Sequence, residues 1–542
     1  MSKRPLVFAF ALGAVHSLSF APDPLPAAFL PWLQVICLVI FFFLIANAPR
    51  AARAASIGFF FGMGTFVTGL YWLTVSMHQY GGMPLWMAII ALIGFAAYLS
   101  LYPTLSAWLF RRMSAGQTQD LTPKGIIGLG AFWAAIWTLC EWLRGTLLTG
   151  FAWLNTASGQ VEGWLAGWSA WIGPYGITFI VAWVSAIVAC SLHNNRLRQA
   201  HGFRGVQTLP LFLAGLLCAA GAFLAQWSWT HDQGPAVVIR LVQGDIDQAE
   251  KFTPQGFLKA IELYQSLSGH EQDQQQHKPD IVLLPETVMT QVPNRIHADI
   301  WSSWIQTATD HNTSILMGSP LQQSDAGGYT NSVILIDRSD QADSLQQSQV
   351  RAHYDKQHLV PFGEYVPWGF QWFIDLMHIP LGHFETGSSE QRPLQVANQS
   401  IAPNICYEDV FAEDLLPSVR QGATILANFS NLGWFGNTNA LTQHWQMARL
   451  RAMETQRPMV RSTNTGMTGA IDHWGNTIAV LPTMAAGYVD VRIQGQTGLT
   501  PYVRYGNTPV LIVCLLIVII GVPFSRRLQR PTLKQEAQTH AD

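Results

Sequence analysis

The chain has 542 residues, of which 49% are hydrophobic and only 12% are charged, with a formal net charge of -2. Soluble proteins carry about 25% charged residues, so this composition indicates a chain that lies partly in a membrane. Charged residues are scarce before about residue 230 and ordinary from there to about 500, which predicts a membrane part and a water-facing part. The small net charge and the lack of a basic stripe argue against general nucleic-acid binding, and the sequence has neither a P-loop nor a dinucleotide-binding glycine fingerprint.

A helix needs roughly 20 mostly apolar residues to cross a bilayer, and about eight segments meet this condition. The first segment follows Lys3 and Arg4 and could be mistaken for a signal peptide. No clear small-x-small cleavage site precedes Asp23 and further apolar segments follow, so we expect a retained anchor. The predicted spans lie near residues 5–22, 28–46, 56–77, 86–109, 126–149, 175–193, 209–228 and 508–524.

The basic residues between these spans predict their orientation. Alternate connections, near 23–27, 78–85 and 150–174, contain no lysine or arginine, whereas the others are basic. Because basic loops stay in the cytoplasm, we expect both termini there and the long region after the seventh span outside, in the periplasm if the cell has an outer membrane. The basic residues are Lys3, Arg4, Arg50, Arg53, Arg111, Arg112, Lys124, Arg196, Arg198, Arg204, Arg526, Arg527, Arg530 and Lys534.

Charged and aromatic residues within the membrane part allow two interpretations each. Glu141 and Arg144 are three residues apart on one helical face, so they form either a functional pair or a self-neutralising structural pair. The tryptophan-rich stretches Trp72–Pro84 and Gly150–Trp171 are expected to lie in the lipid headgroup region, where tryptophan is common. The more specific alternative is that they contact a lipid substrate.

The region 234–503 alternates apolar β-branched runs with polar helical stretches, which predicts an α/β or α-β-β-α layered domain. We therefore divide the chain into a seven-span bundle at 1–233, this domain at 234–503, and a last span with a basic tail at 504–542. Helices are expected at 254–268, 296–310, 412–420 and 440–456, and strands at 236–242, 281–285, 314–318, 332–336, 401–406, 423–428, 459–463, 470–472 and 488–493.

The apolar stretch Val366–His383 is too short and broken to span a membrane. On a membrane-tethered domain, such a stretch favours contact with the bilayer or a lipid site, and packing on the domain's own core is the alternative.

Cys406 is the one cysteine of six that lies in the polar region, directly after the apolar run Ile401–Ile405. A lone thiol there is either a small buried residue or a nucleophile presented at the end of a strand. Considered alone, cysteine statistics favour the first interpretation.

Two further segments place polar side chains at the ends of apolar runs, where a sheet would bring them to a common rim. Glu286 follows Leu283-Leu284-Pro285, and Lys356 precedes Glu364 by eight residues in Tyr354–Tyr365. Each residue alone has an ordinary explanation: Glu286 as a strand-end cap, Lys356 as a solvated charge and Glu364 as part of a surface ion pair.

Together with Cys406-Tyr407-Glu408, the motifs around Glu286 and Lys356 resemble the Glu-Lys-Cys triad of the nitrilase superfamily. The chain is similar over nearly its whole length to the bacterial apolipoprotein N-acyltransferase branch of that superfamily. The short motifs that carry this resemblance include Glu141–Gly145, Tyr71-Trp72, Phe429–Asn431, Trp434–Gly436, Gln443-His444, Ala448–Glu454 and Thr463–Gly466.

The chemistry of these side chains fits an acyl transfer. A thiol needs a base to take its proton, which Glu286 would do. Lys356 and the backbone N–H after Cys406 would stabilise the oxyanion of each tetrahedral intermediate. The resemblance places Glu364 beside this triad, and Tyr407 and Glu408 in the immediate surroundings of the nucleophile.

The resemblance implies a reaction in two halves, without metal or organic cofactor. Cys406 takes an acyl chain from a phospholipid as a thioester, and the N-terminal amine of a diacylglyceryl-cysteine lipoprotein then receives the chain as an amide. This implies an enzyme of the bacterial inner membrane with its catalytic domain in the periplasm, acting as a monomer on phospholipid and apolipoprotein. The apolar stretch 366–383 could shield the thioester from water.

Two positions depart from the family pattern. The family tends to have a tryptophan where this chain has Phe252, and an acidic or amide residue where Leu432-Gly433 precede Trp434. Both departures concern the expected substrate contacts, Phe252 and Trp434, and leave the triad intact.

Two other functions compete with acyl transfer. A membrane-tethered nitrilase-type amidase would use the same triad and give the thioester to water. A transporter or binding protein without catalysis is the alternative from another class, but the spans lack the glycine-broken repeat halves that transporters use.

Overall fold

The computed structural model describes residues 4–20, 25–114, 121–200, 208–269, 278–323, 328–369 and 384–527. The chain forms two compact units. The first, which we call the helical unit, comprises Met1–Tyr71, Ala91–Gln226 and Asn507–Asp542. The second, the sheet unit, comprises Trp72–Ile90 and Trp227–Gly506. A short piece of the N-terminal half, residues 72–90, thus belongs to the same unit as the C-terminal half.

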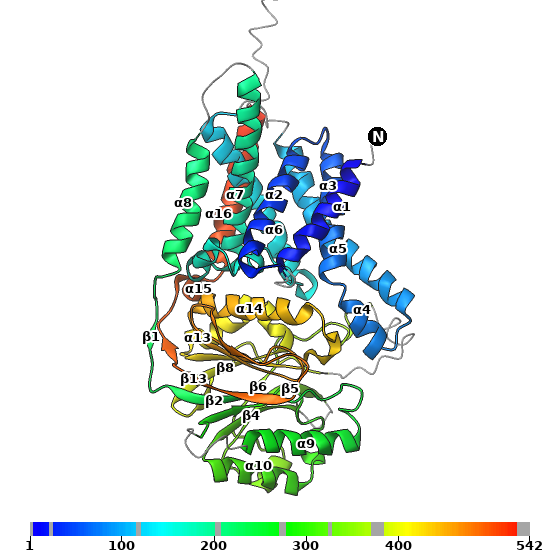
Figure 1. The fold of residues 1–542 in the computed structure, drawn as a ribbon, viewed down its shortest axis with the longest axis vertical. Coiled ribbons are helices and arrows are strands. Elements are labelled where there is room, and N and C mark those ends of the chain that lie inside the picture. The colour runs from blue at the N-terminus through cyan, green and yellow to red at the C-terminus, as the bar shows by residue number, and fades with distance from the viewer. Residues whose placement is uncertain are drawn as a thin grey trace, which may run out of the picture. The chain divides into compact units, whose positions relative to one another are not determined.

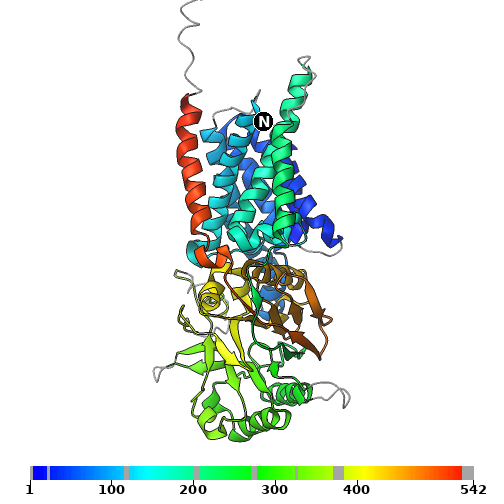
Figure 2. The same ribbon diagram turned by 90° about the vertical axis from the view of Figure 1, so that its left-hand side faces the viewer.

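The helical unit is built from apolar helices that run beside one another (Figures 1 and 2). Four helical stretches are long and apolar enough to cross a membrane: Ala27–Ala46, Leu85–Met113, Pro123–Thr149 and Trp164–Arg196. The bent pair Ala51–Gly69 and Leu73–Tyr80 raises the number to five if it is one span. The helices are α1 (Arg4–Ser17), α2 (Leu30–Ala46), α3 (Ala51–Gly69), α5 (Leu85–Met113), α6 (Pro123–Thr146), α7 (Ser169–Ala200), α8 (Leu209–Leu224) and α16 (Thr508–Arg527).

Three further predicted spans contain shorter apolar helical stretches within the described residues: Arg4–Phe20, Leu209–Leu224 and Thr508–Gly521. At 1.5 Å per residue, a helix of 16 residues is about 24 Å long, against a hydrocarbon core of about 30 Å. Within the described residues, four to five helical stretches are therefore long and apolar enough to span a membrane, and the predicted count of eight is not confirmed.

Glu141 and Arg144 of α6 are buried, and each binds the chain segment that follows the helix. The Arg144 guanidinium donates to the carbonyl oxygens of Phe151 at 2.6 Å and Trp153 at 2.8 Å. Glu141 accepts from the Thr156 hydroxyl at 2.9 Å and lies 3.5 Å from Arg144. These contacts close an irregular segment within the helical unit and favour the structural interpretation of the pair.

The sheet unit contains two six-stranded sheets, each mixing parallel and antiparallel neighbours. The first has the order β13-β2-β3-β4-β5-β6, and the second β12-β11-β10-β9-β8-β7. The first consists of β2 (Val237–Gln243), β3 (Ile281–Leu283), β4 (Ser314–Gln322), β5 (Tyr329–Ile336), β6 (His353–Asp355) and β13 (Gly487–Ile493). The second consists of β7 (Leu394–Val396), β8 (Gln399–Ile405), β9 (Ile425–Ser430), β10 (Met459–Thr463), β11 (Gly469–Ile471) and β12 (Thr477–Val480).

An apolar core of side chains from both sheets lies between them, with Ile239, Leu283, Ile405 and Phe429 among its buried members. The outer face of the first sheet is covered by α9 (Pro254–Gly269) and α10 (Ala298–His311). The second sheet is covered by α13 (Leu416–Arg420) and α14 (Ala440–Thr455) (Figure 1). This arrangement confirms the predicted α-β-β-α layers.

All nine predicted strands are present, with ends that differ by a few residues, and the predicted helices correspond to α9, α10, α14 and the segment ending in α13. The prediction missed β6, β7 and β12 of the large sheets, which have three or four residues each, and the two-residue strands β1 (His231–Asp232) and β14 (Gln496–Thr497), which pair with each other.

Residues 72–90 pack on the sheet unit through aromatic side chains. The Trp72 indole donates to Gln443 Oε1 of α14 at 3.1 Å, and its ring lies 4.5 Å from that of Phe435. Tyr80 contacts Trp434 with 5.9 Å between ring centroids. The tryptophan-rich stretch therefore has a protein partner within its own unit.

Candidate active site

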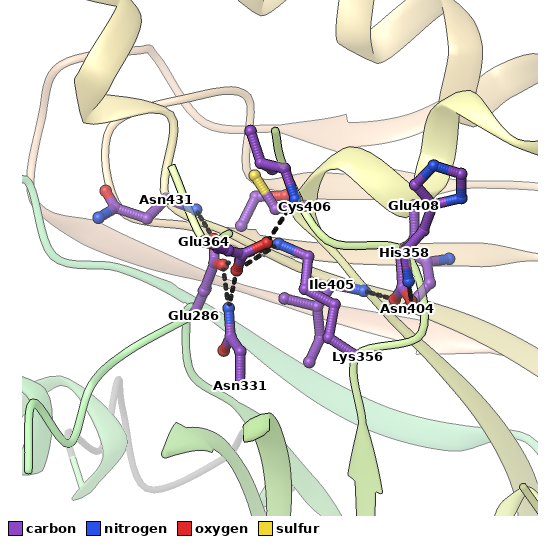
Figure 3. Close-up of polar contacts among 12 residues, drawn as sticks. Glu286, Asn331, Lys356, His358, Glu364, Asn404, Ile405, Cys406, Glu408 and Asn431 are labelled. Carbon is purple, nitrogen blue, oxygen red and sulfur yellow. Dashed lines mark hydrogen bonds and ion pairs between the residues drawn. The ribbon is translucent and has the colours of Figure 1, made fainter. Parts of the chain in front are cut away.

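The predicted triad comes from the ends of strands in both sheets. Glu286 follows β3 and Lys356 directly follows β6 of the first sheet, whereas Cys406 directly follows β8 of the second. Figure 3 shows the three side chains together, as expected where the ends of strands meet. Gly318 of β4 makes room for the turn at Glu286, because a Cβ there would lie 2.3 Å from the Thr287 nitrogen.

Lys356 lies between two carboxylates. Its Nζ is 2.9 Å from Glu364 Oε1 and 3.6 Å from Glu286 Oε1, and the side chain is fully buried. Burial alone would lower the pKa of Lys356, but the carboxylates of Glu364 and Glu286 outweigh it and raise that pKa above its usual value. The ammonium therefore keeps its charge in a site from which water is largely excluded.

Asn331, which the sequence analysis missed, connects the two carboxylates. Its Nδ2 donates to Glu286 Oε1 and to Glu364 Oε1, both at 2.8 Å (Figure 3). The second Glu286 oxygen accepts from the backbone N–H of Asn431 at 2.9 Å. An asparagine within a strand gives no sequence signal for this role, whereas Asn431 lies in the word Phe429–Asn431 that carried the resemblance.

Cys406 has a backbone conformation that only a few non-glycine residues adopt. Its φ is 52°, in the left-handed region, so the chain turns sharply as it leaves β8. Burial and then the Glu286 carboxylate raise the pKa of the Cys406 thiol, while Lys356 and the Asn431 N–H act in the opposite direction. The resting group is therefore a thiol at neutral pH, which needs a base at the moment of attack.

Glu408 fixes the backbone around the nucleophile. Its carboxylate accepts from the backbone N–H groups of Ile405 and Gln357, both at 2.6 Å, and from the Tyr354 hydroxyl at 3.0 Å. Burial raises the pKa of Glu408 to about 7. Glu408 thus ties the end of β8 to the residue after Lys356, which sets the position of nucleophile and lysine relative to each other.

The other predicted supporting residues lie farther out. Tyr407 is buried against Phe411, with 5.1 Å between ring centroids. Phe252 is 56% exposed and Trp434 is 38% exposed. Of the stretch 366–383, residues 370–383 lie outside the described residues, and Trp368 is 99% exposed.

Lys251 is a second buried lysine that the sequence analysis did not single out. Its Nζ donates to the backbone oxygen of Glu286 at 3.2 Å, and its side chain is 2% exposed. Burial lowers the pKa of Lys251 to about 8, although the negative charge of Glu286 acts in the opposite direction. The sequence does not indicate this burial, because a lysine in a polar loop is usually exposed; only the neighbouring Phe252 differed from the family pattern.

This arrangement can perform nucleophilic acyl chemistry. A thiol at a strand end, a carboxylate and a fixed ammonium ion are the parts needed to form and break a tetrahedral intermediate. The same parts serve transfer to an amine and transfer to water, so the geometry alone does not choose the acceptor.

Two family models match the chain. Residues 12–187 match the model described as apolipoprotein N-acyltransferase N-terminal domain. Residues 238–502 match the model described as carbon-nitrogen hydrolase. The second match contains all three triad residues. Among solved structures, an amidase of the nitrilase superfamily from Nesterenkonia AN1 is 16% identical, with a TM-score of 0.36 over 51% of this chain and 97% of that chain.

Full-length relatives match both parts together. An apolipoprotein N-acyltransferase from Bordetella bronchiseptica is 42% identical, with 98% of each chain covered. One from Ralstonia nicotianae is 38% identical, with 95% of this chain and 92% of the relative covered. This chain belongs to the apolipoprotein N-acyltransferase family.

Proposed function

We propose that the chain transfers an acyl chain from a phospholipid to the N-terminal amine of diacylglyceryl-cysteine lipoproteins, with Cys406 as the nucleophile. The observation that carries the proposal is the thiol at the end of β8 beside the buried Glu286 and Lys356, in a chain of this family. The acyltransferase activity belongs to the family, and the assignment of roles to these residues is our inference.

In the first half-reaction, Glu286 takes the thiol proton as the sulfur of Cys406 attacks the ester carbonyl of the phospholipid. The oxyanion that forms is stabilised by the Lys356 ammonium and the backbone N–H of Tyr407. When the intermediate collapses, the ester C–O bond breaks and the proton passes from Glu286 to the leaving alkoxide. The products are a lysophospholipid and a thioester on Cys406.

In the second half-reaction, the lipoprotein amine attacks the thioester carbonyl. Glu286 takes a proton from the nitrogen, the same donors stabilise the second oxyanion, and the C–S bond breaks as the proton passes from Glu286 to the leaving sulfur. The products are an amide and the free thiol. Glu364 keeps Lys356 in place, and the rim residues Phe252 and Trp434 contact the acyl chains.

The proposal includes a membrane arrangement. Eight spans, including the shorter helices α1, α8 and α16, cross the inner membrane with both termini in the cytoplasm. Residues 1–233 form the bundle, 234–503 the periplasmic catalytic domain, and 504–542 the last span with its tail. The enzyme acts as a monomer. The support comes from the apolar helices and the distribution of basic residues.

Mass spectrometry of the intact protein tests the function. Purified enzyme is mixed with phospholipid alone, with Cys406→Ser as the comparison. We expect a fatty-acyl adduct on Cys406 that hydroxylamine removes, and that persists until a lipopeptide amine is added. An adduct that water clears as fast as the lipopeptide does would instead identify a membrane-tethered hydrolase, and no adduct at all would refute the covalent mechanism.

A further inference from the structure

The peptide group between Cys406 and Tyr407 is held through its carbonyl oxygen. This oxygen lies 3.1 Å from Nε2 of His444 on α14, and 3.4 Å from Nδ2 of Asn428 on β9. His444 is 1% exposed and Asn428 fully buried. Two buried side chains from two different elements therefore converge on one backbone atom of the nucleophile.

The neighbours of His444 determine which ring nitrogen carries the proton. Arg461 of β10 places NH2 2.6 Å from Nδ1, and a guanidinium group can only donate. Nδ1 must therefore accept, which leaves the hydrogen on Nε2, where it donates to the Cys406 oxygen. Asp409, the ion-pair partner of Arg461, has Oδ2 3.9 Å from Nε2 and favours a hydrogen there.

His444 stays neutral in this position. Burial and then the positive charge of Arg461 hold the pKa of His444 well below its usual range. The His444 ring contacts the backbone carbonyl of Cys406 and not its sulfur. His444 is therefore placed to orient the backbone. Asp409 binds Arg461, and Arg461 donates to His444. His444 is therefore a neutral hydrogen-bond donor to the Cys406 oxygen, and its ring direction is fixed.

The consequence for the site follows from the planarity of the peptide bond. In a trans peptide, the N–H of one residue points opposite to the C=O of the residue before it. A carbonyl of Cys406 directed at His444 therefore aims the Tyr407 N–H away from His444. Because the left-handed conformation of Cys406 is unfavourable for a residue with a side chain, the peptide needs such partners to keep its orientation.

We propose that His444 is a positioning residue for the oxyanion site: by holding the Cys406 carbonyl, it fixes the direction of the Tyr407 N–H. The inference rests on the proposed function, in which this N–H is an oxyanion donor. It assigns to the word Gln443-His444 a role that the triad does not include.

Two substitutions separate the two hydrogen bonds of the ring. In His444→Asn, the amide lies near the position of Nδ1, so it can accept from Arg461 but cannot reach the Cys406 oxygen. In His444→Gln, the amide nitrogen can reach the position of Nε2 and donate. A third variant, Gln446→Leu, removes another buried polar group from α14 and serves as the control.

Two reactions of Cys406 are measured in the full-length protein in detergent. The first is acyl-enzyme formation from equal amounts of dipalmitoyl phosphatidylethanolamine and phosphatidylglycerol, followed as a hydroxylamine-labile adduct. The second is alkylation by iodoacetamide, a displacement at carbon that forms no oxyanion. If a residue acts on the oxyanion donor, its substitution lowers the rate of acyl-enzyme formation and does not change the rate of alkylation.

We expect His444→Asn to form the acyl-enzyme about 100-fold more slowly, the effect of losing one oxyanion donor, with His444→Gln recovering most of the rate. Alkylation should stay near the wild-type rate in both, and Gln446→Leu should match wild type in both reactions.

Three results would overturn the inference: acylation at the wild-type rate in His444→Asn, a parallel loss of alkylation, or equal loss of acylation in the Asn and Gln variants. If His444→Asn does not fold, His444→Leu, which likewise cannot donate to the Cys406 oxygen, takes its place: a selective loss of acylation supports the inference, and a parallel loss of both rates or no loss refutes it. Failure of the wild type itself to form an adduct would refute the proposed function instead.

Discussion

Glu286 acts on Cys406 in two opposite ways. As a negative charge beside the sulfur, its carboxylate adds to burial in raising the pKa of the thiol. As the proposed base, the same carboxylate removes the thiol proton during attack. Glu286 therefore keeps the resting nucleophile protonated and unreactive, and activates it only when a substrate carbonyl is in place.

The substitution Glu286→Gln separates these two effects. Without the carboxylate, the pKa of the Cys406 thiol falls. Iodoacetamide should therefore alkylate Cys406 faster than in wild type at about pH 8–9, which is near the ordinary pKa of a thiol. Acyl-enzyme formation should fall by about 100-fold or more, because the base is lost. Both rates are measured on the same protein, and a slower alkylation in Glu286→Gln would contradict this account.

Lys251 predicts how stability depends on pH. Its pKa of about 8 in the folded protein lies below the reference value of 10.5. Between these two values the unfolded chain binds the proton more tightly, so the stability of the wild type rises with pH across this window. Each unit of pKa difference corresponds to 1.36 kcal/mol, which gives about 3 kcal/mol in total.

We therefore expect the difference in unfolding free energy between wild type and Lys251→Met to shift by about 3 kcal/mol in favour of wild type, from pH 7 to pH 10.5. Thermal or denaturant unfolding at these two pH values measures the shift. The exposed Lys259→Met controls for the loss of a lysine. A constant difference across the pH range would show that Lys251 titrates normally.

At the level of single residues, the sequence predicts those that stand in characteristic words at the ends of apolar runs. Glu286, Lys356 and Cys406 are of this kind, and the structure brings them to one rim. Asn331 and Arg461 act through partners far away in the chain, and nothing in their neighbouring residues indicates those partners. Their roles follow only from the packing of the two sheets.

Among the secondary-structure elements, the predicted strands were those in which β-branched, apolar residues dominate. The three missed strands of the large sheets, β6, β7 and β12, all lie at sheet edges. Edge strands are short and carry polar residues, which protects the free edge against pairing with other chains. Their weak hydrophobic pattern is a consequence of their position, which the sequence does not reveal.

The contact between residues 72–90 and α14 includes a buried hydrogen bond from Trp72 to Gln443. Trp72→Phe keeps an aromatic ring against Phe435 but leaves Gln443 without its indole donor, and both Trp72 and Gln443 are 2% exposed. We expect this variant to lose about 1–3 kcal/mol of stability in thermal unfolding, the cost of an unsatisfied buried polar group.

Replacing both partners tests the cause of that loss. The double variant Trp72→Phe with Gln443→Met removes donor and acceptor together and should recover much of the stability. If the double variant is destabilised by the sum of the two single effects, the hydrogen bond does not couple the two residues.

For the molecule as a whole, composition predicts apolar segments more reliably than it predicts helix length. Eight apolar segments are visible in the sequence, but where a helix ends depends on local backbone geometry. The helix α8, for example, has 16 residues and ends at Leu224, whereas the predicted span continues to residue 228. This segment therefore reaches the expected span length only with residues that follow the helix.

The hydrogen bond between Trp72 and Gln443 joins residues that are 371 positions apart in the chain. At a synthesis rate of about 5–20 residues per second, roughly 20–75 s pass between the appearance of the first partner and the second. During that interval residues 72–90 have no sheet unit on which to pack. The sheet unit can therefore be completed only when an early segment, already synthesised, is still accessible to the last third of the chain, so a protein made from residues 227–506 alone would lack part of its own surface.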